Sequence, residues 1–288
     1  MADIKKQKRM RKTVQAVWGI VTNSYLKGFA EGKIYTGALK KFCVPGMNCY
    51  SCPGALGACP IGALQAVLGG RHGKFAFYVI GWLAMAGLIA GRFVCGWLCL
   101  FGLFQELLYK LPLPKTNVPD RLDKALRYLK YIMLFLLVII LPFALHGEPY
   151  FCKFICPVGT LEGGIPLVLL NKGLRSAIGV LFKLKFFLLV LCIISSVFIY
   201  RPFCRYICPL GAFYALFQRV SFIRMSFDGE KCIHCGACAR ACQMKVDPVK
   251  TPNSCECIRC GECVSACPKS ALELGVCKGE GKIIAEQE

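Results

Sequence analysis

The chain has 288 residues, 56% of them hydrophobic, and a mean hydropathy of +0.53. These values exceed the average for soluble domains and favour residence in a membrane. The formal net charge is +20, but the basic residues flank apolar segments and do not form one stripe with interleaved aromatic side chains. We therefore attribute the charge to contact with membrane lipid headgroups and exclude nucleic acid as a partner.

The N-terminal segment 1–12 is strongly basic and precedes the first apolar stretch. We expect it to anchor at the anionic cytoplasmic leaflet through Lys5, Lys6, Lys8, Arg9, Arg11 and Lys12. The apolar part that follows, 14–21, is short and has no clear small-residue cleavage site. No cleavable signal peptide is therefore evident.

Three apolar segments read as transmembrane helices: 75–91, 131–145 and 186–200. Each is uncharged and bounded by Arg or Lys, and each is slightly shorter than the roughly 20 residues that a spanning helix needs. Flanking residues must therefore complete them. A weaker fourth candidate, 13–30, contains Asn23 and Lys27. We predict four transmembrane helices.

A short motif recurs four times along these segments. In each copy a cysteine is followed three residues later by a glycine, and another cysteine lies upstream of the first. The cysteines that are followed by glycine are Cys59, Cys99, Cys156 and Cys208. After Cys99 the usual proline is replaced by Leu100. Apolar segments too short to span follow the copies, at 61–70, 101–111, 158–170 and 210–217, and we expect re-entrant or interfacial helices there. Because each repeat contributes one span, successive cysteine pairs are expected at opposite membrane faces.

The second and fourth repeats supply one candidate metal site. Cys95 and Cys99 lie one helical turn apart, as do Cys204 and Cys208. Together they offer the four thiolates that a [4Fe-4S] cluster requires. With a cytoplasmic N-terminus, this site lies at the inner face.

The outer face offers six candidate metal ligands: Cys43, Cys49, Cys52, Cys59, Cys152 and Cys156. Either the first four form a site of their own, or Cys152 and Cys156 join two of them. We favour the shared arrangement, because it mirrors the inner site and Cys59 aligns with Cys156. Cys49 and Cys52 are the next choices, and Cys43 is the last.

The tail carries two copies of a ferredoxin motif. The spacing C-x2-C-x2-C-x3-C is that of bacterial two-cluster ferredoxins, in which the fourth cysteine of each run binds the other cluster. One cluster is assigned to Cys232, Cys235, Cys238 and Cys267, and the other to Cys257, Cys260, Cys263 and Cys242. Paired zinc knuckles are disfavoured, because zinc sites use separated C-x2-C pairs.

Few other residues carry recognisable chemistry. Cys192, Cys255 and Cys277 fall outside the motifs and are not expected to be ligands, and His72 and His146 are expected to make interfacial hydrogen bonds. The sequence contains no dinucleotide fingerprint, P-loop or Ser/His/Asp arrangement. No catalytic residue is assigned.

These motifs together resemble those of the membrane polyferredoxins of the NapH/NosR type. The resemblance rests on segments 48–53, 59–65, 95–99 and 201–206 and on the double ferredoxin tail. It implies a four-helix membrane iron–sulfur protein with cytoplasmic termini, which passes electrons between a quinol or cytoplasmic donor and an extracytoplasmic partner. No flavin-binding domain of the NosR kind is fused, so the resemblance implies a separate flavin-bearing or thioredoxin-like acceptor.

The expected fold is therefore a membrane α-helical bundle plus a small α+β two-cluster ferredoxin domain. We divide the chain into a basic cytoplasmic N-terminus (1–12), a transmembrane domain (13–224) and a cytoplasmic ferredoxin domain (225–288), in a multi-pass protein of the bacterial inner membrane. We expect two [4Fe-4S] clusters in the tail and two in the membrane domain. The predicted function is electron relay from a cytoplasmic donor to an extracytoplasmic partner.

Two alternatives stay open. A menaquinol-oxidising respiratory subunit would handle protons through Glu106, Glu148 or Tyr150 and would bind a quinone. A redox sensor or metal-cofactor assembly factor would load clusters without sustained electron flow. Direct relay also faces a distance of about 30 Å across the hydrocarbon core. It therefore needs dipping helices that carry both membrane sites inward, or a bridging quinone or flavin.

Overall fold

The computed structural model describes residues 2–70, 77–145, 147–176 and 178–276, so His72, His146 and Cys277 lie outside the described residues. The elements before the tail are α1 (Ala2–Thr22), α2 (Leu26–Glu31), η1 (Ala38–Lys41), α3 (Pro60–Leu68), α4 (Phe77–Ala90), α5 (Phe93–Trp97), α6 (Leu100–Tyr109), α7 (Asp120–Ile132), η2 (Met133–Ile140), α8 (Leu141–Ala144), η3 (Phe151–Ile155), η4 (Gly159–Gly164), α9 (Ile165–Leu170), α10 (Lys172–Ser176), α11 (Val180–Phe198), α12 (Pro202–Tyr206) and α13 (Pro209–Leu216). The tail contains β1 (Ile223–Phe227), α14 (Ala237–Ala241), α15 (Glu262–Ala266) and β2 (Leu272–Val276).

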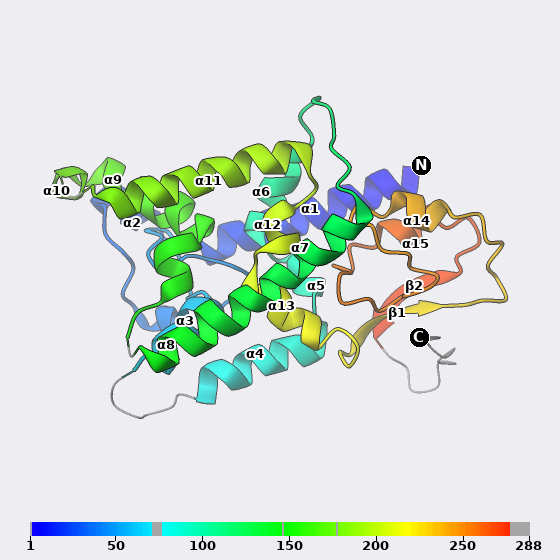
Figure 1. Cartoon of the computed structure of the whole chain (residues 1–288), viewed down its shortest axis with the longest axis horizontal. Helices are drawn as coiled ribbons and strands as arrows, with labels where there is room; N and C mark the ends of the chain where they lie inside the picture. The colour runs from blue at the N-terminus through cyan, green and yellow to red at the C-terminus, as the bar shows by residue number, and fades with distance from the viewer. Residues whose placement is uncertain (1, 71–76, 146, 177, 277–288) are drawn as a thin grey trace.

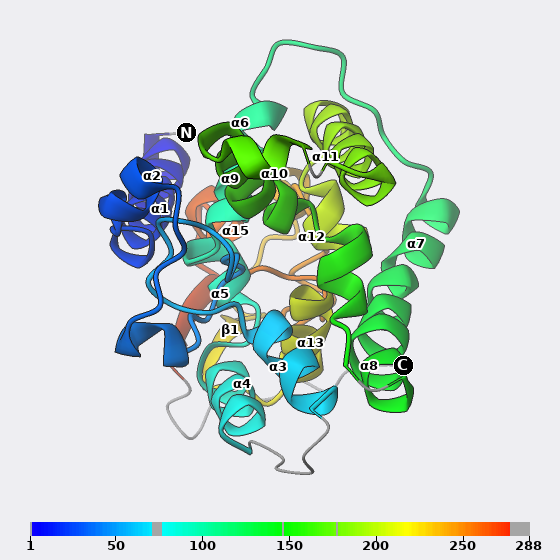
Figure 2. The same cartoon turned by 90° about the vertical axis from the view of Figure 1, so that its left-hand side faces the viewer.

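Four long helical rods surround a set of short helices. Helices α1, α4 and α11, and the continuous run of α7, η2 and α8, extend along the long direction of the molecule (Figure 1). Viewed from one end, these rods enclose α3, α5, α12 and α13 (Figure 2). The short helices carry or border the repeated cysteines, which are therefore held inside the bundle.

Two of the described helices are long and apolar enough to cross a membrane, Asp120–Ala144 and Val180–Phe198. They contain most of the spans expected at 131–145 and 186–200. The segment expected at 75–91 forms the shorter apolar helix Phe77–Ala90, and the weak candidate 13–30 contains the end of α1, which stops at Thr22. A bundle that crosses the membrane four times stays a prediction.

Short helices follow three of the four repeated cysteines directly. Cys59, Cys99 and Cys208 have extended backbones and are the N-cap residues of α3, α6 and α13. Proline at the first helical position of α3 and α13 suits this start, because its fixed φ is helical and its missing N–H would have no partner there. The remaining copy, at Cys156, is followed by a helical stretch that includes the π-helical η4 and continues as α9.

The tail forms the small α+β unit that the sequence predicts. Strands β1 and β2 pair antiparallel, with Ile223 opposite Val276. Helices α14 and α15 each begin after a glycine with positive φ, Gly236 at 68° and Gly261 at 78°. Glycine tolerates this left-handed backbone, which lets each cysteine loop turn sharply into its helix.

Part of the basic N-terminus is not at a lipid surface. Helix α1 is continuous across the boundary expected at 12/13, and Arg11 on it is 1% exposed. Its guanidinium makes two hydrogen bonds to the Glu106 carboxylate, at 2.7 and 2.8 Å, and lies 3.3 Å from Glu262 of the tail. Arg11 therefore joins α1, α6 and α15 instead of binding headgroups, because a buried guanidinium needs charged partners.

Candidate iron–sulfur sites

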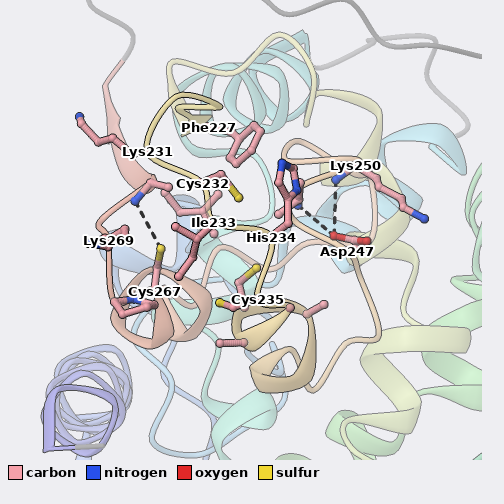
Figure 3. Close-up of a pocket in the computed structure, with 18 residues that line it drawn as sticks. Phe227, Lys231, Cys232, Ile233, His234, Cys235, Asp247, Lys250, Cys267 and Lys269 are labelled. Carbon is pink, nitrogen blue, oxygen red and sulfur yellow. Dashed lines mark hydrogen bonds between the residues drawn. The ribbon is translucent and has the colours of Figure 1, made fainter.

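The first tail site is a cavity lined by all four of its predicted cysteines. Cys232, Cys235, Cys238 and Cys267 line a space of about 180 Å³ between β1, α14 and the loop before β2 (Figure 3). Cys235 is exposed, whereas Cys238 is buried. The backbone N–H of Ala271 donates to the Cys267 sulfur at 3.3 Å. This site is therefore the more accessible of the two in the tail.

The second tail site brings together the other predicted set. The Cys263 thiol interacts electrostatically with Cys257 and Cys242, and Cys260 interacts with Cys257. Burial raises the pKa of the Cys263 thiol to about 12, so metal binding there must displace a proton.

This second site faces the membrane bundle. Arg259, between its first two cysteines, is 0% exposed and donates to the backbone oxygens of Ala90 at 3.1 Å and Gln218 at 2.6 Å. The indole N–H of Trp97 donates to the Arg259 carbonyl at 3.0 Å. The corresponding residue of the first site, His234, is exposed instead. The two halves of the tail thus have different surroundings, one at solvent and one at the bundle.

The inner membrane site gathers Cys95, Cys99, Cys204 and Cys208, as the repeat pattern predicts. All four are buried, and the Cys208 thiol interacts electrostatically with each of the other three. They come from α5, from the residue before α6, from α12 and from the residue before α13.

At the site predicted for the outer face, the structure brings cysteines of the first and third repeats together. The Cys156 thiol interacts electrostatically with Cys152, Cys49 and Cys59, so the first and third repeats meet as the second and fourth do. Cys43 interacts electrostatically with Cys59. The Cys52 thiol lies 3.8 Å from the Asn23 side-chain oxygen and interacts electrostatically with Cys49.

The two membrane sites share a hydrogen-bond pattern. Six residues after Cys59 and Cys99 stand Gln65 and Gln105, whose side-chain N–H groups donate to the sulfurs of Cys152 at 3.3 Å and Cys204 at 3.1 Å. The Gln65 and Gln105 side-chain oxygens accept the backbone N–H groups of the residues preceding those cysteines, at 3.0 and 3.1 Å. The bundle therefore has an internal pseudo-symmetry that relates repeats one and three to repeats two and four.

The repeated glycine serves the same purpose in every copy. Its backbone N–H donates to the sulfur of the cysteine three residues earlier, at 3.4 Å for Gly159 and Gly211, and the same bond occurs at Gly62 and Gly102. A Cβ on Gly159 would lie 3.8 Å from the Cys49 sulfur, inside the thiol group. Glycine thus supplies an amide donor to sulfur while leaving the space among the thiols open.

The charges around the two membrane sites differ. At the inner site the buried Arg201 donates to the Cys95 carbonyl at 2.6 Å and pairs with Glu106 at 2.7 Å, and Arg205 pairs with Asp123 at 2.6 Å. At the outer site the partly buried Glu162 side chain accepts the Cys49 N–H at 2.8 Å. Burial raises the pKa of Glu162 to about 7. Fixed guanidinium charges thus lie near one site, whereas a titratable carboxyl and the Lys185 ammonium, which donates to the Cys152 carbonyl at 3.1 Å, border the other.

The residues at these four sites fit [4Fe-4S] clusters. Each site offers four thiols, backbone N–H groups donate to sulfurs at all four, and glutamine N–H groups do so at the two sites of the bundle; such donors tune bound clusters. The Asn48 side-chain amide is buried with no hydrogen-bond partner among the described residues, beside the outer thiols. Among those residues no group of three or more His, Cys, Asp or Glu side chains is spaced to hold a single metal ion.

Sequence reasoning missed the residues that support the thiols. Gln65, Gln105 and Glu162 occupy the same position of the repeat, and aligning the four copies beyond the glycine would have revealed that position. Arg201 and Met47 carry no local signal, because their importance arises from contacts across the bundle. Glu106, considered for proton handling, is held by Arg11 and Arg201, while Glu148 pairs with Lys153 at the surface.

Comparison with known proteins agrees with this geometry. Residues 57–78, 75–119, 129–170 and 184–227 match a family described as a 4Fe-4S binding domain, and together these segments exceed half of the chain. Residues 225–246 and 256–273 match a second family of the same description. No solved structure gives a significant match.

Relatives come from archaea and bacteria. The chain is 35% identical over 168 residues to the uncharacterized protein MJ0750 of Methanocaldococcus jannaschii, covering 55% of this chain and 61% of that protein. It is 28% identical over 181 residues to the putative electron transport protein YccM of Escherichia coli, covering 61% and 47%. It is 30% identical over 165 residues to the regulatory protein NosR of Stutzerimonas stutzeri, covering 55% and 21%.

The matched region thus spans less than two thirds of each of these relatives. The repeated and tail segments nevertheless both match 4Fe-4S binding domains, in the positions where the structure gathers cysteines in fours. The chain belongs to the family described as a 4Fe-4S binding domain.

Proposed function

We propose that this protein carries electrons across a membrane, from a cytoplasmic donor to an extracytoplasmic flavin-bearing or thioredoxin-like partner. The observation that carries the proposal is the succession of four cysteine groups along the molecule. An accessible tail site is followed by a tail site against the bundle, then by the inner and the outer membrane sites. [4Fe-4S] clusters bound there would supply one-electron redox chemistry.

The exposed surfaces of the rods support four membrane crossings. Apolar side chains face outward on each of them, including Ile20 of α1, Ile89 of α4, Phe143 of α8 and Phe187 of α11. Contiguous exposed apolar surface on a soluble monomer would be unfavourable, whereas lipid accommodates it. On this arrangement the first residues of α1 lie beside α15 of the tail, so both share one side of the membrane.

A cytoplasmic location of that side is supported by chemistry. Cys235 of the first tail site is exposed, and clusters with accessible thiolate ligands persist where cysteines stay reduced. The inner site then lies toward the cytoplasm and the outer site toward the extracytoplasmic side of a bacterial inner membrane.

The quinol-oxidising alternative has less support. Glu106, one of its candidate proton carriers, is ion-paired with two arginines. Although burial acts to raise it, the charges of Arg201 and Arg11 lower the pKa of Glu106 to about 2, so this carboxylate stays ionised near neutral pH. A quinone site elsewhere in the protein would appear as cluster reduction by a menaquinol analogue in detergent.

Reconstituted vesicles test the proposal. The protein is inserted with its tail on the outside of the vesicles, dithionite is added outside, and ferricyanide is trapped inside. Protease cleavage of the tail checks the orientation. We expect ferricyanide reduction with the unaltered protein and its loss in Cys208→Ala and in Cys156→Ala. Cys192→Ala, which removes a thiol on α11 that interacts with Ser196 and belongs to neither group of four, should retain the rate. Equal rates in protein-free vesicles and in all variants would overturn the proposal.

A further inference from the structure

We infer that segment 45–49 contacts both the inner and the outer site and provides the direct path for electrons between them. Met47, within the segment, and Tyr214, which contacts it from α13, are its positioning residues. This inference rests on the proposed function, because it concerns the passage between two of the proposed clusters. The segment belongs to the first repeat and ends at Cys49 of the outer site.

Met47 ties the segment to the inner site. Its sulfur lies 3.4 Å from the sulfur of Cys208, and its backbone N–H donates to the sulfur of Cys99. Met47 is 4% exposed. The preceding residue, Gly46, also lies against the inner site, since a Cβ there would be 3.4 Å from the Cys99 Cα atom. A residue of an outer repeat thus contacts two thiols of the inner site.

The next two residues tie the same segment to the outer site. The backbone N–H of Asn48 donates to the sulfur of Cys59, and Cys49 is itself one of the outer thiols. The Asn48 side chain is 4% exposed and has no hydrogen-bond partner among the described residues. A buried amide of this kind costs stability unless it meets an acceptor or donor, and a cluster at the outer site would supply sulfide acceptors.

Tyr214 holds the segment in place from the opposite repeat. It lies on α13, six residues after Cys208, and its hydroxyl donates to the Pro45 carbonyl at 2.8 Å. The side chain is fully buried and interacts electrostatically with Cys95 and Cys99 of one site and with Cys59 of the other. The phenol is therefore positioned between the two groups of thiols.

The hydrogen bonds limit how far apart the sites can be. The amide nitrogens of Met47 and Asn48 belong to neighbouring residues and are about 3.8 Å apart at most. Each donates to one sulfur over about 4 Å, so the Cys99 and Cys59 sulfurs lie within about 12 Å of one another. The hydrocarbon core is about 30 Å thick. The short helices therefore bring both sites inward, and the passage needs no quinone or flavin between them.

The test is electron paramagnetic resonance of the fully reduced protein, with iron content measured on the same samples. We expect the inner-site signal to be broadened by a neighbouring paramagnet and to narrow in Cys156→Ala, which removes an outer ligand. Met47→Leu keeps the volume but removes the sulfur, and it should shift the g-values and midpoint potential of the inner-site signal at unchanged iron content. Tyr214→Phe should change the broadening of the inner-site signal, because it removes the hydrogen bond that holds Pro45.

A matched change elsewhere provides the control. Met225→Leu, which alters a buried methionine on β1, should leave the broadening of the inner-site signal unchanged. Loaded membrane sites whose signals show no mutual broadening, or a Met47→Leu spectrum identical to that of Met225→Leu, would overturn this inference alone. An iron content that leaves the membrane sites without clusters would overturn the proposed function as well.

Discussion

The carbonyl oxygen of Ile258 occupies the place where a side chain on Gly96 would stand. A Cβ built on Gly96 would lie 2.3 Å from this oxygen, far inside contact distance. Gly96 follows Cys95 of the inner site, and Ile258 follows Cys257 of the second tail site. The absence of a side chain at position 96 therefore lets two proposed cluster sites approach, backbone against backbone.

Replacing this glycine should push the tail away from the bundle. We expect Gly96→Ala to destabilise the docked state by about 1–3 kcal/mol, because the Ile258 backbone has to move. Amide hydrogen exchange in 257–263 should accelerate. Gly81→Ala is the matched control, since a Cβ on Gly81 meets nothing within 4 Å. Unchanged exchange in Gly96→Ala would contradict the close approach.

The two glutamines should tune the two membrane sites separately. Gln105→Leu removes the N–H donor to Cys204 and leaves the Phe203 N–H without its acceptor, at a cost of about 1–3 kcal/mol. The midpoint potential of the inner site should fall, because N–H donors to sulfur stabilise the reduced, more negative cluster. Gln65→Leu should lower only the outer potential. Potentiometric titration that shows the same shift from either change would refute this assignment.

The buried Glu106 should give a defined pH dependence. Its folded-state pKa of about 2 lies below the ordinary value of 4.5, despite burial and because of Arg201 and Arg11. A lowered carboxyl pKa contributes stability above pH 4.5, and this contribution is lost as pH falls toward 2. The contribution of Glu106 to the melting temperature in detergent should therefore be the same at every pH between 6 and 8.

Neutralising that carboxylate isolates its contribution. Glu106→Gln leaves the buried Arg201 without its charged partner and leaves Arg11 with Glu262 alone, and it should cost about 3–5 kcal/mol at neutral pH. The difference in unfolding free energy between Glu106→Gln and the unaltered protein should shrink as the pH falls below 4.5. Glu148→Gln, at an exposed pair with Lys153, should have little effect. A Glu106→Gln protein as stable as the unaltered one at pH 7 would contradict the role of this ion network.

Two neighbouring cysteines should differ in their effect on iron content. Cys49→Ala removes a thiol from the group around Cys156 and should cost about four iron atoms per chain. Cys52→Ala should retain the full iron content, since its thiol lies beside Asn23. Equal losses from both changes would favour the alternative in which 43–59 forms a site of its own.

The sequence predicted those features whose signal is local. The ferredoxin spacing identified both tail sites, and the repeated Cys-x-x-Gly predicted the pairing of the second and fourth repeats. The outer set remained open between two arrangements, because the first repeat has four irregularly spaced cysteines and only the fold brings Cys49 toward Cys156.

Interactions between distant segments could not be predicted in this way. The basic run in the first half of α1 was assigned to lipid, yet Arg11 is buried against Glu106, 95 residues away. The same holds for Met47 at Cys208 and for Ile258 at Gly96, where ordinary residues acquire importance only through contacts across the bundle. Membrane crossing by α1 and α4 likewise stays a prediction, since their length and composition alone do not establish it.

Iron and acid-labile sulfide per chain test the central claim most directly. Four thiol groups that each bind a [4Fe-4S] cluster predict about 16 iron atoms and about 16 sulfides in anaerobically purified protein. About eight of each, unaffected by Cys208→Ala or Cys156→Ala, would restrict the clusters to the tail and contradict a relay through the membrane.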